Sequence, residues 1–412
     1  MQHWPIRIGV KASLIGLFEM TLKRFFLPLI LIFLVFVSGC NFSRDPRVIT
    51  PQPAVLSPSA SLPTILPTQA ATPDFIPPSE TPIETSVPTS TMTFSPTATE
   101  VVWEVGRELT IEYLRSLDIL GSEIVFEKKL ADGPNYHQYY ASYISEGNKI
   151  YGLLTIPFGD PPESGFKAIV FNHGYIPPAV YRTTERYTAY VDYLARSGFV
   201  VFKIDYRGHG ESEGEPTGSY FSPGYTIDAI AALKSLQMLD IIDPQGIGMW
   251  GHSMAGNLVL RAMLMEPDIQ AGVIWAGAVY SYADFEEYGI TDNTYRPPAT
   301  PESQETPVPR SRSREIFDTY GRPDTQVAYW KAVSLTENIE FLNHPIQLHH
   351  AEDDTVVNIG YSSNLAAVLL GNGKEYEYYI YAAGGHNLIS PSFDQAMLRT
   401  VAFFRDHLGS NE

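Results

Sequence analysis

Short apolar runs alternate with segments of helical period beyond residue 160, and this alternation restricts the fold more than any other feature. The apolar runs are three to six residues long and lie at 168–171, 200–204, 247–250, 272–275, 346–348 and 376–381. The helical segments between them include 185–196, 226–239, 254–265 and 362–370. Runs this short and this apolar are typical of strands buried on both faces. The pattern predicts an α/β fold in which helices cover both faces of a mostly parallel central sheet.

Three further segments, 123–131, 136–145 and 149–157, precede these runs. Gly133 and Gly147 separate them, and glycine favours tight turns. We therefore expect antiparallel strands at the N-terminal end of the domain.

The N-terminal segment 1–39 has the features of a secretory signal peptide. Its residues 25–37 read FFLPLILIFLVFV, follow two basic residues and precede Ser38-Gly39-Cys40. This run is shorter than the roughly 20 residues that span a hydrocarbon core, and it matches the apolar region of a signal peptide. The alternative is an N-terminal membrane helix.

Residues 37–40, Val-Ser-Gly-Cys, resemble the lipobox of bacterial lipoproteins. The resemblance implies that Cys40 carries a diacylglyceryl group and becomes the mature N-terminus. Two acyl chains hold a protein on a bilayer where one chain is marginal. The lipobox resemblance therefore implies a protein anchored in the cell membrane through lipidated Cys40, on the extracytoplasmic face. Cys40 is the only cysteine, so no intrachain disulfide can form.

Residues 40–100 are rich in Pro, Ser and Thr, which predicts a disordered tether. Residues 101–412 then form one domain with an insertion at about 284–343, which we expect to be a small cap over the active site. Within the insertion, 297–314 is Pro-rich and polar, and 316–335 has the pattern of a helix.

Ser253 lies between an apolar strand and a helix that starts at once, in the sequence Gly251-His252-Ser253-Met254-Ala255. A nucleophile elbow requires this context, with small residues two places before and after the serine so that strand and helix pass closely. Gly251 and Ala255 fill these places. Serine is also a favoured helix N-cap, so capping is the alternative interpretation.

Two later loops carry the groups that a serine nucleophile needs. A serine hydroxyl requires an adjacent base, itself oriented by a carboxylate. His386 follows the run 376–381, and Asp353 and Asp354 follow the run 346–348. All three groups would meet at one edge of the sheet, because each follows a strand.

Residues 123–408 resemble the α/β-hydrolase fold, and most closely the catalytic domain of the prolyl oligopeptidase-like serine peptidase family. The matching segments are Asn172-His173-Gly174-Tyr175, Asp205 to Ser212, the elbow, 350–357 and Gly385-His386. The resemblance implies that Ser253 is the nucleophile, His386 the general base and Asp354 the carboxylate, with Asp353 as the alternative acid.

An oxyanion formed by attack on a carbonyl needs fixed hydrogen-bond donors. The fold supplies the backbone N–H of Met254, the first residue of the helix. The resemblance implies a second donor at Tyr175, whose alternative role is an aromatic wall of the pocket.

Several polar residues are interpreted as structural. We expect His173, His209 and His252 to brace loops. The acidic residues Asp284, Glu286 and Glu287 are interpreted as a solvated loop. His349 and His350 point to opposite faces of a strand, which argues against a metal site with their acidic neighbours. No metal or cofactor is implied, because acyl transfer by serine needs only the protein's own groups.

The sequence therefore predicts a lipid-anchored extracytoplasmic serine hydrolase that cleaves peptide or ester bonds through an acyl-enzyme. Within that class an aminopeptidase or oligopeptidase and a carboxylesterase are alternatives, and a noncatalytic surface binding module is a third. The expected partner is a small peptide or ester. The formal charge of 28 − 46 = −18 leaves no broad basic face for a phosphate backbone, which excludes nucleic acid.

Overall fold

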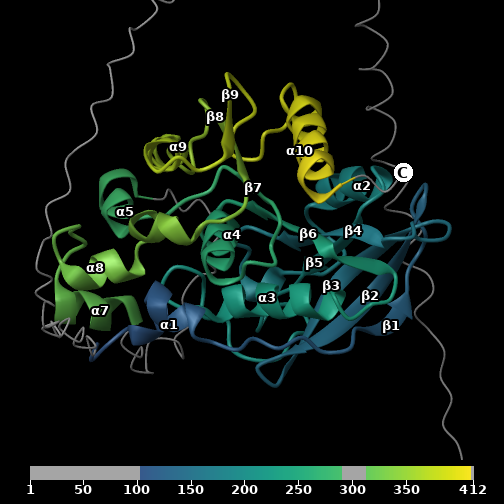
Figure 1. The fold of residues 1–412 in the computed structure, drawn as a ribbon, viewed down its shortest axis with the longest axis horizontal. Helices are drawn as coiled ribbons and strands as arrows, with labels where there is room; N and C mark the ends of the chain where they lie inside the picture. Colours follow the sequence, from purple (N-terminus) through teal and green to yellow (C-terminus); the bar gives the residue numbers. More distant parts are fainter. Residues whose placement is uncertain (1–102, 290–311, 410–412) are drawn as a thin grey trace, which may run out of the picture. The chain divides into compact units, whose positions relative to one another are not determined.

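A nine-stranded sheet forms the centre of the computed structural model, which describes residues 103–289 and 312–409 (Figure 1). Its order is β1-β2-β3-β5-β4-β6-β7-β8-β9. Strands β4 to β9 pair in parallel, whereas β1, β2, β3 and β5 pair antiparallel with one another in that order. The predicted sheet with antiparallel N-terminal strands is confirmed. The strands are β1 (Val125–Lys129), β2 (Tyr136–Ser145), β3 (Asn148–Pro157), β4 (Phe166–Asn172), β5 (Val200–Ile204), β6 (Ile242–His252), β7 (Gly272–Trp275), β8 (Ile346–Ala351) and β9 (Tyr376–Tyr381).

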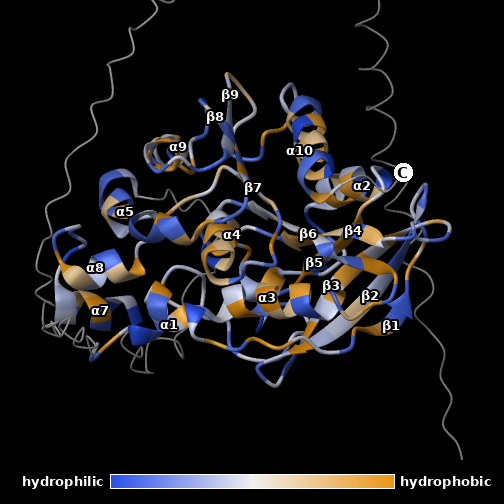
Figure 2. Cartoon of the chain, viewed as in Figure 1, coloured by the Kyte–Doolittle hydropathy of each residue, from blue (hydrophilic) through white to orange (hydrophobic). Residues whose placement is uncertain are grey.

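Helices cover both faces of this sheet, as predicted. On one face, α2 (Thr188–Arg196) and α10 (Phe393–Leu408) pack together, and both contribute side chains to one buried apolar cluster. A second cluster lies under the helices of the other face. Figure 2 shows the apolar residues concentrated on the inner helices α3 and α4 and on the strands. The helices of this face are α1 (Ile111–Arg115), α3 (Gly224–Leu236), α4 (Met254–Met265) and α9 (Gly360–Gly371).

Four of the predicted segments have the bounds that the sequence predicts. Strands β5, β7 and β9 and helix α4 coincide with 200–204, 272–275, 376–381 and 254–265. The helix predicted from residue 185 instead begins at Thr188. Arg186 and Tyr187 adopt φ values of 52° and 53°, which an α-helix does not contain.

The insertion contains α5 (Tyr282–Tyr288), α7 (Arg312–Tyr320), α8 (Ala328–Val333) and the 3₁₀ helix η3 (Thr336–Phe341). The single helix predicted over 316–335 is wrong. Gly321, at φ 72°, ends α7, and Pro323 follows it. The two helices pack against the start of the domain, where Tyr320 Oη donates to the Val105 carbonyl.

The solvated acidic loop expected at Asp284, Glu286 and Glu287 is also wrong, because these residues lie in helix α5. Ser281 caps the helix by accepting a hydrogen bond from the Ala283 amide. Asp284 is partly buried and accepts a hydrogen bond from Asn364, and Glu286 pairs with Arg322.

Several sequence predictions lie outside the described residues. They are the signal peptide 1–39, the tether 40–100, lipidated Cys40 and most of the Pro-rich stretch 297–314. Within residues 103–289 and 312–409, no helix has both the length and the apolar character needed to cross a membrane.

Strand β6 and helix α4 approach so closely that Gly251 has no room for a side chain. A Cβ there would lie 2.7 Å from both the Ala255 carbonyl oxygen and the Val259 Cγ2. We expect Gly251→Ala to lower the free energy of unfolding by about 1–3 kcal/mol, because backbone must move to accommodate the methyl group. Urea denaturation of the purified protein measures this change.

Gly371→Ala is the matched control, because a Cβ at this helical position meets nothing within 4 Å. It should leave stability unchanged or raise it slightly. Equal stabilities for the two variants would contradict the steric argument.

Candidate active site

The sheet brings the three expected groups to one edge. Ser253 comes directly after β6, and Asp354 and His386 lie in the loops that follow β8 and β9. Because these strands are parallel, their carboxyl ends lie on the same side of the sheet. The order of β6, β7, β8 and β9 across the sheet therefore places the serine loop near both other loops.

Ser253 has the backbone of a strained strand-to-helix turn. Its φ of 57° and ψ of −119° are unfavourable for a residue with a side chain. The turn is held by a 2.9 Å hydrogen bond from the Ser253 amide to the Trp275 carbonyl of β7. On its other side, α4 begins at Met254 and is buried along its whole length. The packing around the elbow thus imposes the strain.

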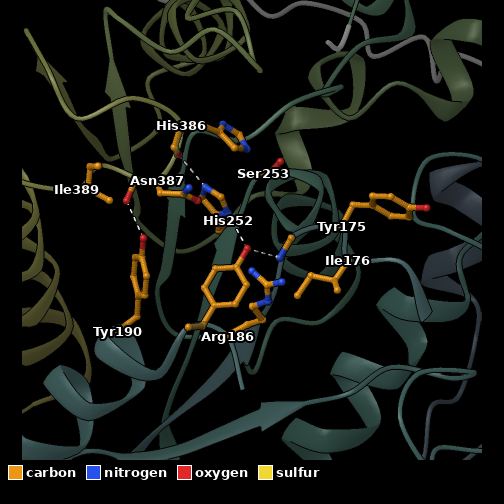
Figure 3. A pocket seen from close by; sticks show the side chains of 11 residues that line it. Tyr175, Ile176, Arg186, Tyr190, His252, Ser253, His386, Asn387 and Ile389 are labelled. Carbon is orange, nitrogen blue, oxygen red and sulfur yellow. Dashed lines mark hydrogen bonds between the residues drawn. The ribbon is translucent and has the colours of Figure 1, made fainter. Parts of the chain in front are cut away.

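Ser253 and His386 line one pocket of about 390 Å³ (Figure 3). The Ser253 hydroxyl makes no hydrogen bond to another described residue. His386 Nδ1 is directed instead to Asp354 Oδ2, at 2.8 Å. The imidazole and the hydroxyl therefore share the cavity while the far side of the imidazole is held by the carboxylate. Hydrogen bonds between catalytic groups are often long before substrate binds.

The Asp354 carboxylate is buried and fully bonded. Its Oδ1 accepts from the amides of Val356 and Val357, and its Oδ2 lies 3.2 Å from His350 Nε2. Burial alone would raise the pKa of Asp354, but the hydrogen bonds from His350 and His386 outweigh it and hold the pKa well below its usual range. An ionised carboxylate can only accept, so His386 Nδ1 carries the proton.

Asp353 has a different place. Its carboxylate accepts hydrogen bonds from the backbone amides of Gly385, at 2.7 Å, and Gly384, at 3.3 Å. It therefore holds the loop that carries His386 and contacts the main chain of that loop. The structure brings Asp354, the first choice of the two acids, to the imidazole.

His252 links the end of β6 to the His386 loop and, through Tyr187, to Gly174. Its Nε2 lies 2.8 Å from the His386 carbonyl oxygen, which can only accept, so Nε2 donates. Burial, and next the neighbouring His386, lower the pKa of His252 to about 3. The neutral ring then accepts at Nδ1 from the Tyr187 hydroxyl, 2.8 Å away. Tyr187 in turn accepts from the Gly174 amide.

The expected oxyanion donors are Met254, the next residue after Ser253, and Tyr175, which lines the same pocket. Met254 is the first residue of α4, where backbone N–H groups have no partner within the helix. Tyr175 lines the pocket, but its ring is 53% exposed and points away from Ser253 (Figure 3). The ring thus does not wall the space next to the serine, and the Tyr175 backbone N–H remains the candidate donor.

A model of the prolyl oligopeptidase family matches residues 185–411, more than half of the chain. This chain belongs to that family. Its membership, together with the fold, makes it a serine hydrolase. The match starts at the turn before α2 and includes every strand from β5 onward.

The relatives of this chain include a dipeptidyl peptidase and a protein whose name does not mention a peptidase. It is 28% identical over 244 residues to protein ABHD12B of Homo sapiens, covering 58% of this chain and 60% of that protein. It is 25% identical over 276 residues to dipeptidyl peptidase 8 of Homo sapiens, covering 64% and 28%. The chain thus spans less than two thirds of either relative.

The fold is shared with solved esterases as well. Acetyl xylan esterase 1 from Thermoanaerobacterium sp. superposes with a TM-score of 0.50 at 16% identity, covering 73% of this chain and 91% of that one. Identity this low shows the fold alone.

The other buried histidines of this prolyl oligopeptidase-family chain make structural contacts, and one of them, His350, contacts the proposed acid Asp354. His173 Nδ1 bonds the Gly174 carbonyl and His209 Nε2 the Ile176 carbonyl, so both brace loops as expected. His349 contacts Tyr381, whereas His350 contacts Ser362 and Asp354. Among the described residues no group of three or more His, Cys, Asp or Glu is arranged to hold a metal ion.

Sequence reasoning missed the pocket wall formed by Ile176, Arg186, Tyr187 and Tyr190. These residues come from the segment between β4 and α2 and from the first turn of α2. The position of this segment after a strand was the available signal, because ligand sites form there.

Asparagine substitutions distinguish the two candidate acids, Asp354 and Asp353. We expect Asp354→Asn to lower kcat/KM for 4-nitrophenyl butyrate by roughly 100- to 10,000-fold, because His386 loses its orientation and its partner charge. Asp353→Asn should lower it by only about tenfold or less, since it weakens a loop contact. A larger loss in Asp353→Asn would show that the wrong acid had been assigned.

Proposed function

We propose that this serine hydrolase cleaves ester or peptide bonds through an acyl-enzyme formed on Ser253. His386 is the general base, and Asp354 is the carboxylate that orients it. One observation carries the proposal: His386 is bonded through Nδ1 to a buried, ionised Asp354 while it shares a pocket with a strained elbow serine. A binding module has no chemical need for this combination.

The reaction follows from the proton positions. With the proton on Nδ1, the neutral His386 has a free lone pair on Nε2, which removes the proton from Ser253 Oγ as it attacks the carbonyl. The oxyanion forms next to the amides of Met254 and Tyr175. His386 then protonates the leaving group, and water releases the acyl group by the same steps. Asp354 stabilises the imidazolium at each stage.

Ester hydrolysis is the second candidate, and the pocket supplies an observation in its favour. No acidic side chain is among the described residues that line it. A peptide N-terminus would therefore find no carboxylate partner there. Membership of the family supports peptide bonds, so both substrate classes belong in the first assay.

We also propose that Cys40 is lipidated and holds the domain on the extracytoplasmic face of the cell membrane. Support comes from the sequence 25–40, which pairs an apolar run with a lipobox-like cysteine. The Pro-, Ser- and Thr-rich residues 40–100 would separate the hydrolase from the bilayer.

The nucleophile is tested with a fluorophosphonate probe. The wild-type protein should be labelled covalently, and Ser253→Ala should lose both the label and turnover of 4-nitrophenyl butyrate, because Ser253 is the only serine or threonine among the described residues that line the pocket with His386. Ser363→Ala is the control, since Ser363 bonds Tyr378 and lies outside the pocket. Labelling that persists in Ser253→Ala would refute the assignment.

The anchor is tested by detergent partition of the full chain expressed in a bacterium. Wild type should enter the detergent phase of Triton X-114 and incorporate labelled palmitate, whereas Cys40→Ser should do neither because the thioether cannot form. Equal palmitate incorporation by both proteins would contradict lipidation at Cys40.

A further inference from the structure

Arg186 is the one permanently charged side chain among the described residues that line the Ser253 pocket. The remaining wall consists of tyrosines, isoleucines, a glycine and an asparagine, beside Ser253 and the two histidines. In Figure 3 the Arg186 side chain extends from the base of the pocket toward the side where Ser253 and His386 lie. A guanidinium group in this position faces whatever substrate reaches the serine.

The Arg186 guanidinium has no carboxylate within ion-pair distance in the described parts of the chain. Arg207, by contrast, pairs with Asp228 and Glu146, and Arg322 pairs with Glu286. Acidic residues are abundant, with 46 Asp and Glu against 28 Lys and Arg. A pocket arginine without an acidic partner is therefore notable in a chain of net charge −18.

The main chain at Arg186 is held in an unfavourable conformation from two sides. Arg186 and Tyr187 have φ values of 52° and 53°. Below them the buried Lys203 Nζ donates to the carbonyls of Glu185, at 3.0 Å, and Arg186, at 3.4 Å. The Tyr187 hydroxyl is hydrogen-bonded to the Gly174 amide and to His252 Nδ1. Such strain persists only where the surroundings impose it, and it gathers at ligand sites.

These observations point to an anionic substrate. We propose that Arg186 binds a carboxylate of the substrate, so that the enzyme prefers esters or amides that carry a carboxylate close to the scissile carbonyl. The planar guanidinium presents two parallel N–H donors that match a carboxylate. This inference rests on the proposed hydrolase function and adds the substrate class to it.

The acidic residues of α5 do not provide a binding site for a substrate ammonium group. Asp284 bonds Asn364 and Glu286 pairs with Arg322, and neither lines the pocket. A substrate ammonium group thus has no partner among the described pocket residues, whereas a carboxylate has Arg186.

The test uses matched esters and the full chain. In the acyl arm, kcat/KM is measured for 4-nitrophenyl monosuccinate and for neutral 4-nitrophenyl butyrate. In the leaving-group arm, 4-carboxyphenyl butyrate is compared with phenyl butyrate. Each pair gives a preference ratio of charged to neutral ester, and the arm that responds shows which side of the bond carries the carboxylate.

Arg186→Gln removes the charge and keeps the length of the side chain. It should lower the ratio in one arm by roughly three- to tenfold, as expected for a partly exposed charge pair. Arg186→Lys should retain part of the preference. Added salt should lower the ratio in wild type but not in Arg186→Gln.

Arg182→Gln is the control for long-range charge. Arg182 lies in the same loop but outside the pocket, and its guanidinium bonds the carbonyls of Ala179 and Tyr181. The proposal is overturned if both ratios are unchanged in Arg186→Gln, or if Arg182→Gln lowers them equally.

A binding measurement separates this proposal from the proposed catalysis. Ser253→Ala, which retains the pocket, is titrated calorimetrically with 4-nitrophenyl monosuccinate, with and without Arg186→Gln. Weaker binding in the double variant supports Arg186 even if the wild type neither turns over esters nor labels with fluorophosphonate, the result that rejects hydrolysis. Equal binding by the two variants rejects the role of Arg186.

Discussion

The contact between β6 and α4 is the constraint on which the site depends. Gly251 allows the strand to meet the helix at Ala255, and the chain turns between them at Ser253 with a φ of 57°. The Ser253 amide donates a hydrogen bond to the Trp275 carbonyl of β7. Strand, helix and neighbouring strand together leave the serine one conformation, in which its side chain enters the pocket. A looser crossing would relax the turn and withdraw the proposed nucleophile.

The buried residues His252 and His350 connect the loops of the site. His252 donates to the His386 carbonyl and accepts from Tyr187, which also holds the Gly174 amide. The segments next to the proposed nucleophile, base and oxyanion donor thus share one chain of hydrogen bonds. Burial lowers the pKa of His252 to about 3, so its ring is neutral near neutral pH and this chain of hydrogen bonds is kept there. On the other side, His350 and two backbone amides hold the Asp354 carboxylate.

The family shows the chemistry that this fold carries, and the pocket adds what the family does not specify. The relatives of this chain include a dipeptidyl peptidase and protein ABHD12B, and its fold is shared with a solved acetyl xylan esterase. Family membership makes the chain a serine hydrolase without fixing the bond that it cleaves. In this chain a strained turn, held by buried Lys203, places Arg186 in the wall of the pocket that contains Ser253. Specificity would then arise from a loop while the sheet supplies the chemistry.

The sequence by itself determined the layered fold, because short apolar runs at 200–204 and 272–275 have no stable place except between covering helices. It also predicted Ser253 and His386 as nucleophile and base, because their positions after strands follow from local pattern. Only the tertiary structure decided between Asp353 and Asp354, since both follow β8 and their partners, Gly385 and His386, lie in a loop that is distant in sequence. It likewise decided the turn at Arg186, where contacts from Lys203 and Gly174 override the helical pattern. Local periodicity records burial, whereas these choices depend on residues that only folding brings together.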